Sequence, residues 1–381
     1  MRRSSLPSEA VRGLPFAQAG HAPTPMDGTG ASRLAFFSAA RACLSKGRHP
    51  HPIEARNANV VNTCRDWLNA GVIPGGEEIL VRLEDATSRY HTNAEMLLRA
   101  IAADPARQRA CLRSGVPADA DDGTGHCVAA PYMFWMRPHV LIEGTDALER
   151  MLVASDLGDD LPAGLFRPPA PACYLHFGPA FRDALAPGGR YPRFGESRPQ
   201  GVYVFETNDA SGRALALVTV HEVGDHPGLG IDGVDLRIDD EGQALVDLIR
   251  NLASGTTEAH RARHLALVDM VAKTFLYFGL AESIRQEERP HSETRERLAR
   301  QGPRKAARSG RRLDTLYDRI VLGPHEIPGH GNCELSPHLR RGHFRMQPHG
   351  PQMALRKLIY IAPTWVRPDK LAAVDTATPQ P

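Results

Sequence analysis

Histidine, arginine and glutamine side chains alternate along residues 342–349, which read GHFRMQPH. Alternate side chains of an extended strand point to opposite faces, so His343, Arg345 and Gln347 share one face while Phe344 and Met346 share the other. Arginines gain affinity for RNA by neutralising phosphates and can also stack on exposed bases. The pattern therefore predicts a surface that contacts RNA or the ribosome.

Turn residues and a second apolar run follow this strand, and together they predict a β-hairpin. Pro348, Gly350 and Pro351 are typical turn residues, and Leu355–Ile361 is an apolar run that only Arg356 and Lys357 interrupt. The residues expected to contact RNA or the ribosome are Arg340, Arg341, His343, Arg345, Gln347, Arg356, Lys357 and Trp365. The alternative is a solvated basic surface whose aromatic residues lie in the core.

The same residues also allow a catalytic hypothesis, that of a metal-independent endoribonuclease. His343 and His349 would exchange protons with the 2′-hydroxyl and the leaving oxygen, and Arg345 would hold the phosphate. Closeness in sequence does not place these groups within hydrogen-bond reach of one phosphate, so catalysis requires a geometry that the strand pattern leaves open.

A second chemical hypothesis is a zinc site just before the hairpin. His325, His330, Cys333 and His338 have short spacings of the kind found in small structural zinc sites, but they include one thiol only. The surrounding glycines and prolines predict an irregular loop equally well. No cofactor is expected from any other motif, because the chain shows no P-loop, dinucleotide fingerprint or nucleophile elbow.

Length and composition are typical of a globular protein with more than one structural unit. The chain has 381 residues, 42% hydrophobic residues and a formal net charge of +2. Its six cysteines form no C-x-x-C pair, which favours free thiols in a reducing compartment. No run is apolar and long enough for a secretory or membrane-spanning segment, so we expect a soluble cytoplasmic protein.

The pattern of apolar residues predicts an α+β fold with a helical N-terminal region, a central mixed α/β body and a basic C-terminal hairpin. Helical spacing is clearest over residues 76–102, and strands are expected at 132–142, 173–177, 201–206 and 214–221. The last three should share one sheet. The expected units are a flexible leader (1–30), the helical region (31–157), the body (158–284), a charged linker (285–318), the hairpin module (319–370) and a tail (371–381).

Several segments resemble one known family. The runs LPAGLFRPPAPACYLHF and GVYVFE, and above all HLRRGHFRMQPHG followed by RKLIYIAPTWV, are similar to the type V-A anti-CRISPR proteins of the second AcrVA group and their homologues on bacterial mobile elements. The resemblance covers roughly the last two-thirds of the chain. Phe344 stands where tryptophan is expected from the family pattern.

The resemblance implies an inhibitor that lowers production of the type V-A effector nuclease in the cytoplasm of a bacterial host. Such a protein recognises the nascent effector polypeptide and causes loss of its messenger RNA. The family-like positions are Arg340, Arg341, His343, Arg345, Gln347 and Trp365, and the resemblance assigns no catalytic role to them. An endoribonuclease or an RNA-binding protein of a mobile element remains the alternative.

Overall fold

The structure is a computed structural model that describes residues 49–69, 75–85, 88–102, 124–186, 190–191, 195–209, 212–223, 229–252, 257–300, 316–326 and 338–366. None of the helices in these ranges is long and apolar enough to cross a membrane.

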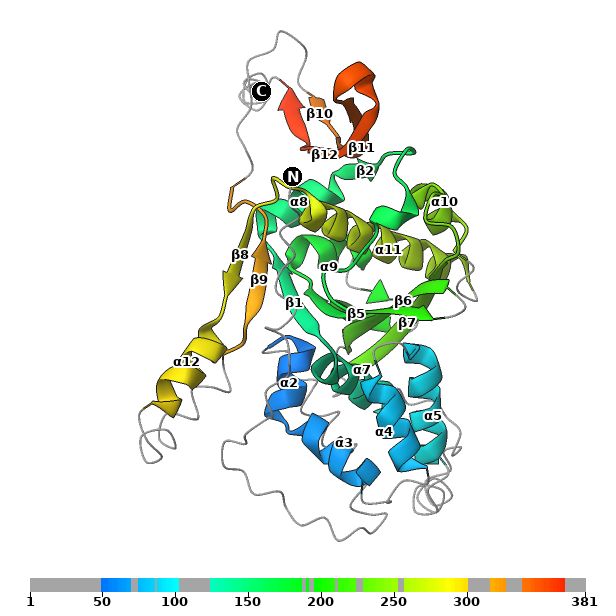
Figure 1. Cartoon of the computed structure of the whole chain (residues 1–381), viewed down its shortest axis with the longest axis vertical. Coiled ribbons are helices and arrows are strands. Elements are labelled where there is room, and N and C mark those ends of the chain that lie inside the picture. Colours follow the sequence, from blue (N-terminus) through cyan, green and yellow to red (C-terminus); the bar gives the residue numbers. More distant parts are fainter. Residues whose placement is uncertain are drawn as a thin grey trace, which may run out of the picture.

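A twisted mixed sheet forms the centre of the molecule (Figure 1). Its strands are β1 (His139–Gly144), β3 (Ala172–His176), β4 (Arg190–Tyr191), β5 (Gly195–Asp209), β6 (Gly212–Val223), β7 (Leu229–Ile238), β8 (Arg285–Glu288) and β9 (Arg319–Leu322). The order is β7-β6-β5-β3-β1-β9-β8, and β4 pairs with β5. Strand β1 is parallel to both β3 and β9, whereas the remaining pairs are antiparallel.

Helices cover both faces of this sheet and give three layers (Figure 1). One layer contains α2 (His51–Asn57), α3 (Val60–Asn69), α4 (Gly76–Glu84), α5 (Tyr90–Ala102) and α7 (Thr124–Met136). The other contains α8 (Asp146–Val153), α9 (Pro179–Leu185), α10 (Leu245–Arg250), α11 (Glu258–Gly279) and the short 3₁₀ turn Ala163–Leu165. Helix α12 (Pro290–Ala299) extends beyond the layers at the far end of β8.

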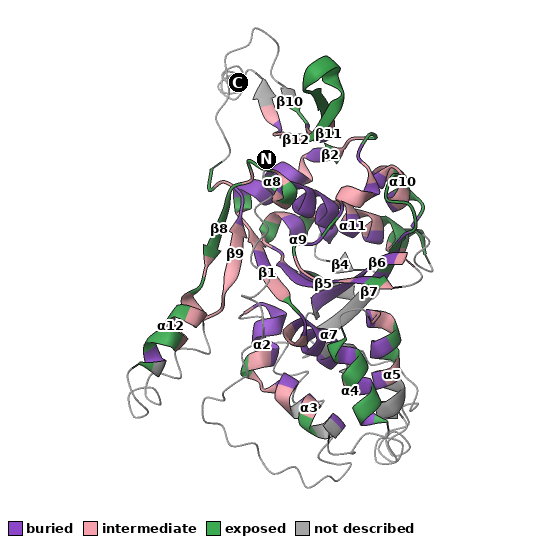
Figure 2. Ribbon diagram, viewed as in Figure 1, coloured by how far each residue is buried: buried purple, intermediate pink, exposed green. Residues whose placement is uncertain are grey.

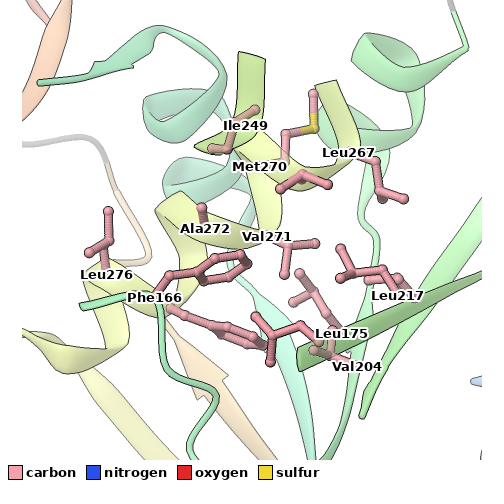
Figure 3. Close-up of a cluster of buried hydrophobic side chains, with 14 of the residues drawn as sticks. Phe166, Leu175, Val204, Leu217, Ile249, Leu267, Met270, Val271, Ala272 and Leu276 are labelled. Atoms are coloured by element: carbon pink, nitrogen blue, oxygen red, sulfur yellow. The ribbon is translucent and has the colours of Figure 1, made fainter. Parts of the chain in front are cut away.

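Strand alternation supplies a hydrophobic core to each layer. On β3, Tyr174 packs among the N-terminal helices, whereas Cys173 and Leu175 point to the opposite face. Figure 3 shows Leu175 and Val204 meeting Val271 of α11 in that second core. Because both faces are covered, the central strands are almost continuously apolar.

Capping residues fix where the helices near the sheet begin. The Thr145 hydroxyl accepts a hydrogen bond from the Leu148 N–H (3.2 Å) at the start of α8, and Thr257 does the same for His260 (3.2 Å) at the start of α11. Pro179 begins α9, where its missing N–H costs nothing.

A small second sheet stands on the outer side of α8 and α11. It consists of β12 (Leu355–Ile361), β11 (Gly342–His349) and β2 (Ser155–Leu157), with a 3₁₀ turn at Pro351–Met353 joining β11 to β12. Strands β10 (His338–Arg340) and β13 (Thr364–Val366) pair beside it as a separate two-stranded sheet.

The fold class predicted from the sequence is confirmed, as is the hairpin: the structure is α+β with helical N-terminal, central α/β and C-terminal hairpin parts. The strands expected at 173–177, 201–206 and 214–221 correspond to β3, β5 and β6 of one sheet. The helical region 76–102 is divided into two helices, α4 and α5.

The strand expected at residues 132–142 is wrong for its first half, because Thr124–Met136 is helix α7 and β1 begins only at His139. Helix α7 lies between the sheet and the other N-terminal helices, and its described side chains are almost all buried. A helix that is apolar on every side lacks the 3.6-residue period that would distinguish it from a buried strand.

Part of the segment expected to be a charged linker, residues 285–318, forms regular structure. Strand β8 pairs with β9, and the Asp318 carboxylate accepts hydrogen bonds from the His291 and Ser292 N–H groups (3.0 and 3.1 Å) at the start of α12. Sheet pairing and a helix cap therefore order a segment with little apolar surface. Strand β9, at the start of the expected hairpin module, belongs to the central sheet.

Candidate functional site

The candidate site is the hairpin β11–β12, whose register puts its residues on two chemically different faces. Opposed residues of an antiparallel pair share a face. Phe344 opposes Tyr360 and Met346 opposes Leu358 on the inner face. Arg345 opposes Ile359 and Gln347 opposes Lys357 on the outer face. The alternation expected from the sequence is confirmed.

The inner face anchors the hairpin to the body. Phe344 is fully buried, and its ring lies 4.6 Å from that of Tyr360, which in turn meets the edge of Tyr277 on α11 at 5.8 Å. Met346 and Leu358 are half-buried against the same core. These contacts hold the hairpin as an extension of the second hydrophobic core.

A buried polar network joins the base of the hairpin to β2 and α11. The Lys273 ammonium donates to the carbonyl oxygen of Ser155 and forms an ion pair with Asp269 at 2.6 Å. The Ser155 hydroxyl lies 3.0 Å from the Tyr360 hydroxyl. Burial raises the pKa of Asp269 although Lys273 opposes the shift, and burial raises the pKa of Tyr360 to about 12.

Close backbone approach makes two glycines necessary at this junction. A Cβ on Gly342 would lie 2.3 Å from the Ser155 hydroxyl, and one on Gly158 would lie 2.4 Å from the Phe344 carbonyl oxygen. Where β2 ends, Asp160 accepts a hydrogen bond from the Met346 N–H (3.1 Å) and replaces a strand partner. Side-chain packing and backbone contacts therefore both hold the hairpin in one orientation.

The outer face and the tip are open to solvent, as the exposed outer half of the hairpin in Figure 2 shows. Arg345, Gln347 and His349 are exposed, whereas His343 is half-buried near the base. Met353 and Leu355 at the tip are 69% and 54% exposed. Gln352 and Met353 both have left-handed backbone (φ 52° and 57°), a strained geometry that is common in functional loops.

The cations of the hairpin module divide into paired and unpaired groups. Arg341 pairs with Asp156 at 3.1 Å, and Lys357 pairs with Glu282 at 2.9 Å, which lowers the pKa of the Glu282 carboxyl. The side chains of Arg340, Arg345 and Arg356 are exposed and have no partner among the described residues. Free positive charge is therefore carried by three of the predicted RNA-contacting residues, and two others are neutralised within the chain.

These unpaired arginines do not all share one face. Arg345 lies on the outer face of β11, Arg356 opposes Pro348 on the inner side of the exposed tip, and Arg340 lies on β10 opposite Thr364. Trp365 opposes Leu339 in the same two-stranded sheet, and its side chain lies outside the described residues. The cations therefore surround the projecting hairpin rather than converge on one point.

The two histidines of the endoribonuclease hypothesis lie at opposite ends of β11. His343 and His349 are six residues apart in one strand, so their backbones are separated by about 20 Å at roughly 3.3 Å per residue. One phosphodiester cannot lie within hydrogen-bond reach of both imidazoles. The hairpin thus brings Arg345 between the two histidines without forming an acid and base pair.

The zinc hypothesis concerns residues that are described only in part. His325 is exposed on the segment after β9, whereas His330 and Cys333 lie outside the described residues. His338 begins β10, but its side chain is likewise not described. Within the described ranges, no three His, Cys, Asp or Glu side chains are grouped so that they could hold a metal ion.

A pocket that the sequence analysis missed lies where β3 ends and α9 begins. Its volume is about 670 Å³, and the described residues that line it are His176, Phe177, Gly178, Pro179, Arg182, Asp183, Ala186 and Arg198. A β-bulge at Gln200 lies two residues after Arg198, where the pairing of β5 with β6 shifts register. The Gly178-Pro179 step directly after an apolar strand is the sequence signal that could have indicated a helix start there.

The pocket wall contains a histidine in a positive environment. Burial, together with the nearby charges of Arg182 and Arg319, lowers the pKa of His176 to about 4. Its Nδ1 atom is buried and has no hydrogen-bond partner among the described residues. The Arg182 Nε–H donates to the Phe177 carbonyl oxygen at 2.8 Å, which fixes that guanidinium against the end of β3.

A buried carboxylate supports the pocket from behind. Glu149 of α8 accepts hydrogen bonds from the Gly178 N–H (2.6 Å) and the Phe181 N–H (3.3 Å) at the start of α9. Burial raises the pKa of this fully buried carboxyl to about 7, although both hydrogen bonds oppose the shift. Glu149 therefore joins α8 to α9 and titrates near neutral pH.

Comparison with known proteins places this chain in a family. The solved structure described as "Crystal structure of AcrVA2" aligns with 84% of this chain and 100% of its own, at 13% identity and a TM-score of 0.47. No curated protein matches the sequence. The family model "AcrVA2-like: Anti-CRISPR type V subtype A2 family" matches residues 143–368, from the end of β1 to just beyond β13. The chain belongs to this family of type V-A anti-CRISPR proteins, whose members act on components of CRISPR systems.

Proposed function

We propose that this protein inhibits a type V-A CRISPR system by lowering synthesis of its effector nuclease in the bacterial cytoplasm. The central body would recognise the nascent effector polypeptide, and the hairpin would contact the messenger RNA or the ribosome, so that recognition leads to loss of the messenger. Family membership supports the inhibitory role, and the geometry of the hairpin supports the RNA contact.

The observation that carries the RNA contact is the set of exposed, unpaired arginines on a firmly docked projection. Arg340, Arg345 and Arg356 have no partner among the described residues, so they need not break an ion pair there before they bind a phosphate. The anchored inner face keeps the hairpin ordered, so little conformational entropy is lost on binding. A convex cationic element of this kind suits an extended polyanion better than it suits a small ligand.

The test uses cells that express a type V-A effector, with its messenger measured in the presence and absence of this protein. The variant Arg340→Gln/Arg345→Gln/Arg356→Gln should lose most of the messenger-lowering effect. The control Arg250→Gln/Arg297→Gln/Arg300→Gln removes the same charge from exposed positions on or beside α10 and α12 and should keep the effect. Equal effects of the two triple variants would refute the role of the hairpin.

Two altered messengers separate recognition of the polypeptide from recognition of the RNA. A synonymously recoded messenger encodes the same effector in a different RNA sequence, and its level should still fall. A messenger with an early frameshift keeps nearly the same RNA but encodes another polypeptide, and its level should not change. The opposite pattern would show that RNA sequence is read, which would contradict recognition of the nascent chain.

The endoribonuclease alternative gains no support from the hairpin, because no described pair of histidines converges there. Purified protein incubated with a defined RNA in the presence of a chelator tests this alternative directly. A binder leaves the RNA intact and retards it in a gel. Cleavage that His343→Gln abolishes would instead favour the enzyme.

A further inference from the structure

The pocket at the end of β3 has a composition suited to a small anionic ligand. Its lining brings together guanidinium groups from two elements, Arg182 of α9 and Arg198 of β5, beside the His176 imidazole of β3. Asp183 is the only carboxylate among the described lining residues. The remaining lining residues, Phe177, Gly178, Pro179 and Ala186, carry no side-chain charge.

The end of helix α9 is not the source of this anion affinity. The Gly178 and Phe181 N–H groups at this end already donate to Glu149, so those two groups are not available to a ligand. The charged donors at the pocket are side chains. The Arg198 side chain is exposed and has no partner among the described residues, and the Nε–H bond of Arg182 to Phe177 fixes its guanidinium at the pocket wall.

His176 adds an unsatisfied polar group to the same wall. Its buried Nδ1 has no partner among the described residues, and unpaired buried polar atoms are uncommon in folded proteins. The charges that act on this ring are those of Arg182 and Arg319, which are both positive. An anion in the pocket would offset that positive potential.

We propose that this pocket binds the phosphate group of a phosphorylated small molecule, with Arg182 and Arg198 as the charged donors and His176 as an additional donor. Phosphate is favoured over a carboxylate because guanidinium groups from two sides can each bind separate oxygens of one tetrahedral dianion. A volume of about 670 Å³ is within the range of small-molecule sites, and it leaves room for more than the phosphate alone. This site is separate from the hairpin and independent of the proposed function.

The test follows the His176 side-chain signal in a long-range ¹H–¹⁵N spectrum of the full-length protein, with the signal assigned by its absence in His176→Gln. Inorganic phosphate and AMP, added at constant ionic strength, should shift the signal to saturation and raise the pH at which His176 titrates. Adenosine and acetate at the same concentrations should leave it in place. AMP should bind more tightly than inorganic phosphate because its nucleoside fills the remaining volume.

Two charge variants give opposite expected results. Arg198→Gln removes a charged hydrogen bond and should weaken phosphate binding about tenfold or more. Asp183→Asn removes the opposing carboxylate and should strengthen binding. Arg297→Gln on the exposed surface of α12 is the matched charge control and should change nothing.

Thermal melting of each variant checks that the fold is intact, so weaker binding is not confused with unfolding. The proposal is overturned if neither phosphate nor AMP shifts the His176 signal, if adenosine or acetate shifts it as strongly, or if Arg198→Gln binds phosphate as tightly as the unaltered protein.

Discussion

The hairpin and the strand-end pocket use the same types of side chain in opposite geometries. On the hairpin, Arg345 and Arg356 project from a convex element into solvent, so each can meet a different phosphate of a long polymer. In the pocket, Arg182 and Arg198 line one concave space beside a buried imidazole. Curvature thus separates a surface suited to a polyanion from a site suited to one small anion.

The two regions also differ in how strongly salt should affect them. Exposed charges more than a Debye length apart, about 8 Å at physiological ionic strength, are largely screened from one another. The hairpin arginines are exposed to solvent, whereas His176 responds to Arg182 and Arg319 inside a partly buried wall. Polyanion binding by the hairpin should therefore depend steeply on salt, and the pocket should depend on it less.

The largest expected effect on stability comes from removing the side chain that anchors the hairpin to the body. Phe344→Ala deletes a fully buried ring between β11 and the second core, and it should lower the free energy of unfolding by about 3–5 kcal/mol. Urea denaturation measures this decrease, and hydrogen exchange should show faster exchange in β11 and β12. Leu355→Ala, at an exposed position of the same hairpin, should change stability by no more than about 0.5 kcal/mol. Equal decreases in the two variants would contradict an anchoring role for Phe344.

The second prediction concerns the pH dependence of stability that the Glu149 carboxyl behind the pocket should cause. Because burial raises the pKa of Glu149 from 4.5 to about 7, the folded protein binds this proton more tightly than the unfolded chain does. The associated stabilisation is fully present below pH 4.5 and is lost as the pH rises through 7. It should amount to roughly 2–3 kcal/mol between about pH 5 and pH 8.

Glu149→Gln should remove this part of the pH dependence, because the amide stays neutral at every pH tested. Denaturation at the same two pH values measures it. The control Asp247→Asn changes an exposed acid on α10 that does not act on Glu149, and it should keep the dependence. An unchanged pH profile in Glu149→Gln would show that this carboxyl does not titrate near neutral pH.

Substitution of the exposed arginines should have the smallest effect on stability but a clear effect on RNA binding. Arg345→Gln/Arg356→Gln should leave the free energy of unfolding within about 0.5 kcal/mol. The slope of log binding constant against log salt for single-stranded RNA should fall by about 1.4, at roughly 0.7 for each phosphate that is no longer neutralised. Filter binding at several salt concentrations measures the slope. A slope identical to that of the unaltered protein would mean that neither arginine binds phosphate.

Local alternation predicted the hairpin well because its two faces differ in chemistry along a single strand. The sequence showed that Phe344 and Met346 point away from Arg345, and a strand that is buried on one side only preserves this signal. Helix α7 gave no such signal, since its described side chains are buried on almost every side. Its Tyr132–Trp135 stretch therefore looked like a strand.

The pocket could not be predicted from local patterns because its residues meet only through long-range pairing. His176 ends β3 and Arg198 lies on β5, and these strands become neighbours through an antiparallel register that no local spacing specifies. The carboxylate behind them comes from α8, which precedes both strands. In the same way, the neutralisation of Arg341 by Asp156 and of Lys357 by Glu282 depends on the docking of the hairpin.

The parallel pairing of β11 with β2 imposes an order on folding during synthesis. Every strand of the central sheet precedes β11 in the chain, so that sheet can close before the small sheet of β2, β11 and β12 exists. A chain that stopped short of β11 would leave the Ser155 hydroxyl without its contact to Tyr360 and the core without Phe344. Synthesis of β11 and β12 is thus the step that gives the molecule its projecting basic hairpin, and chains that end before β11 would lack it.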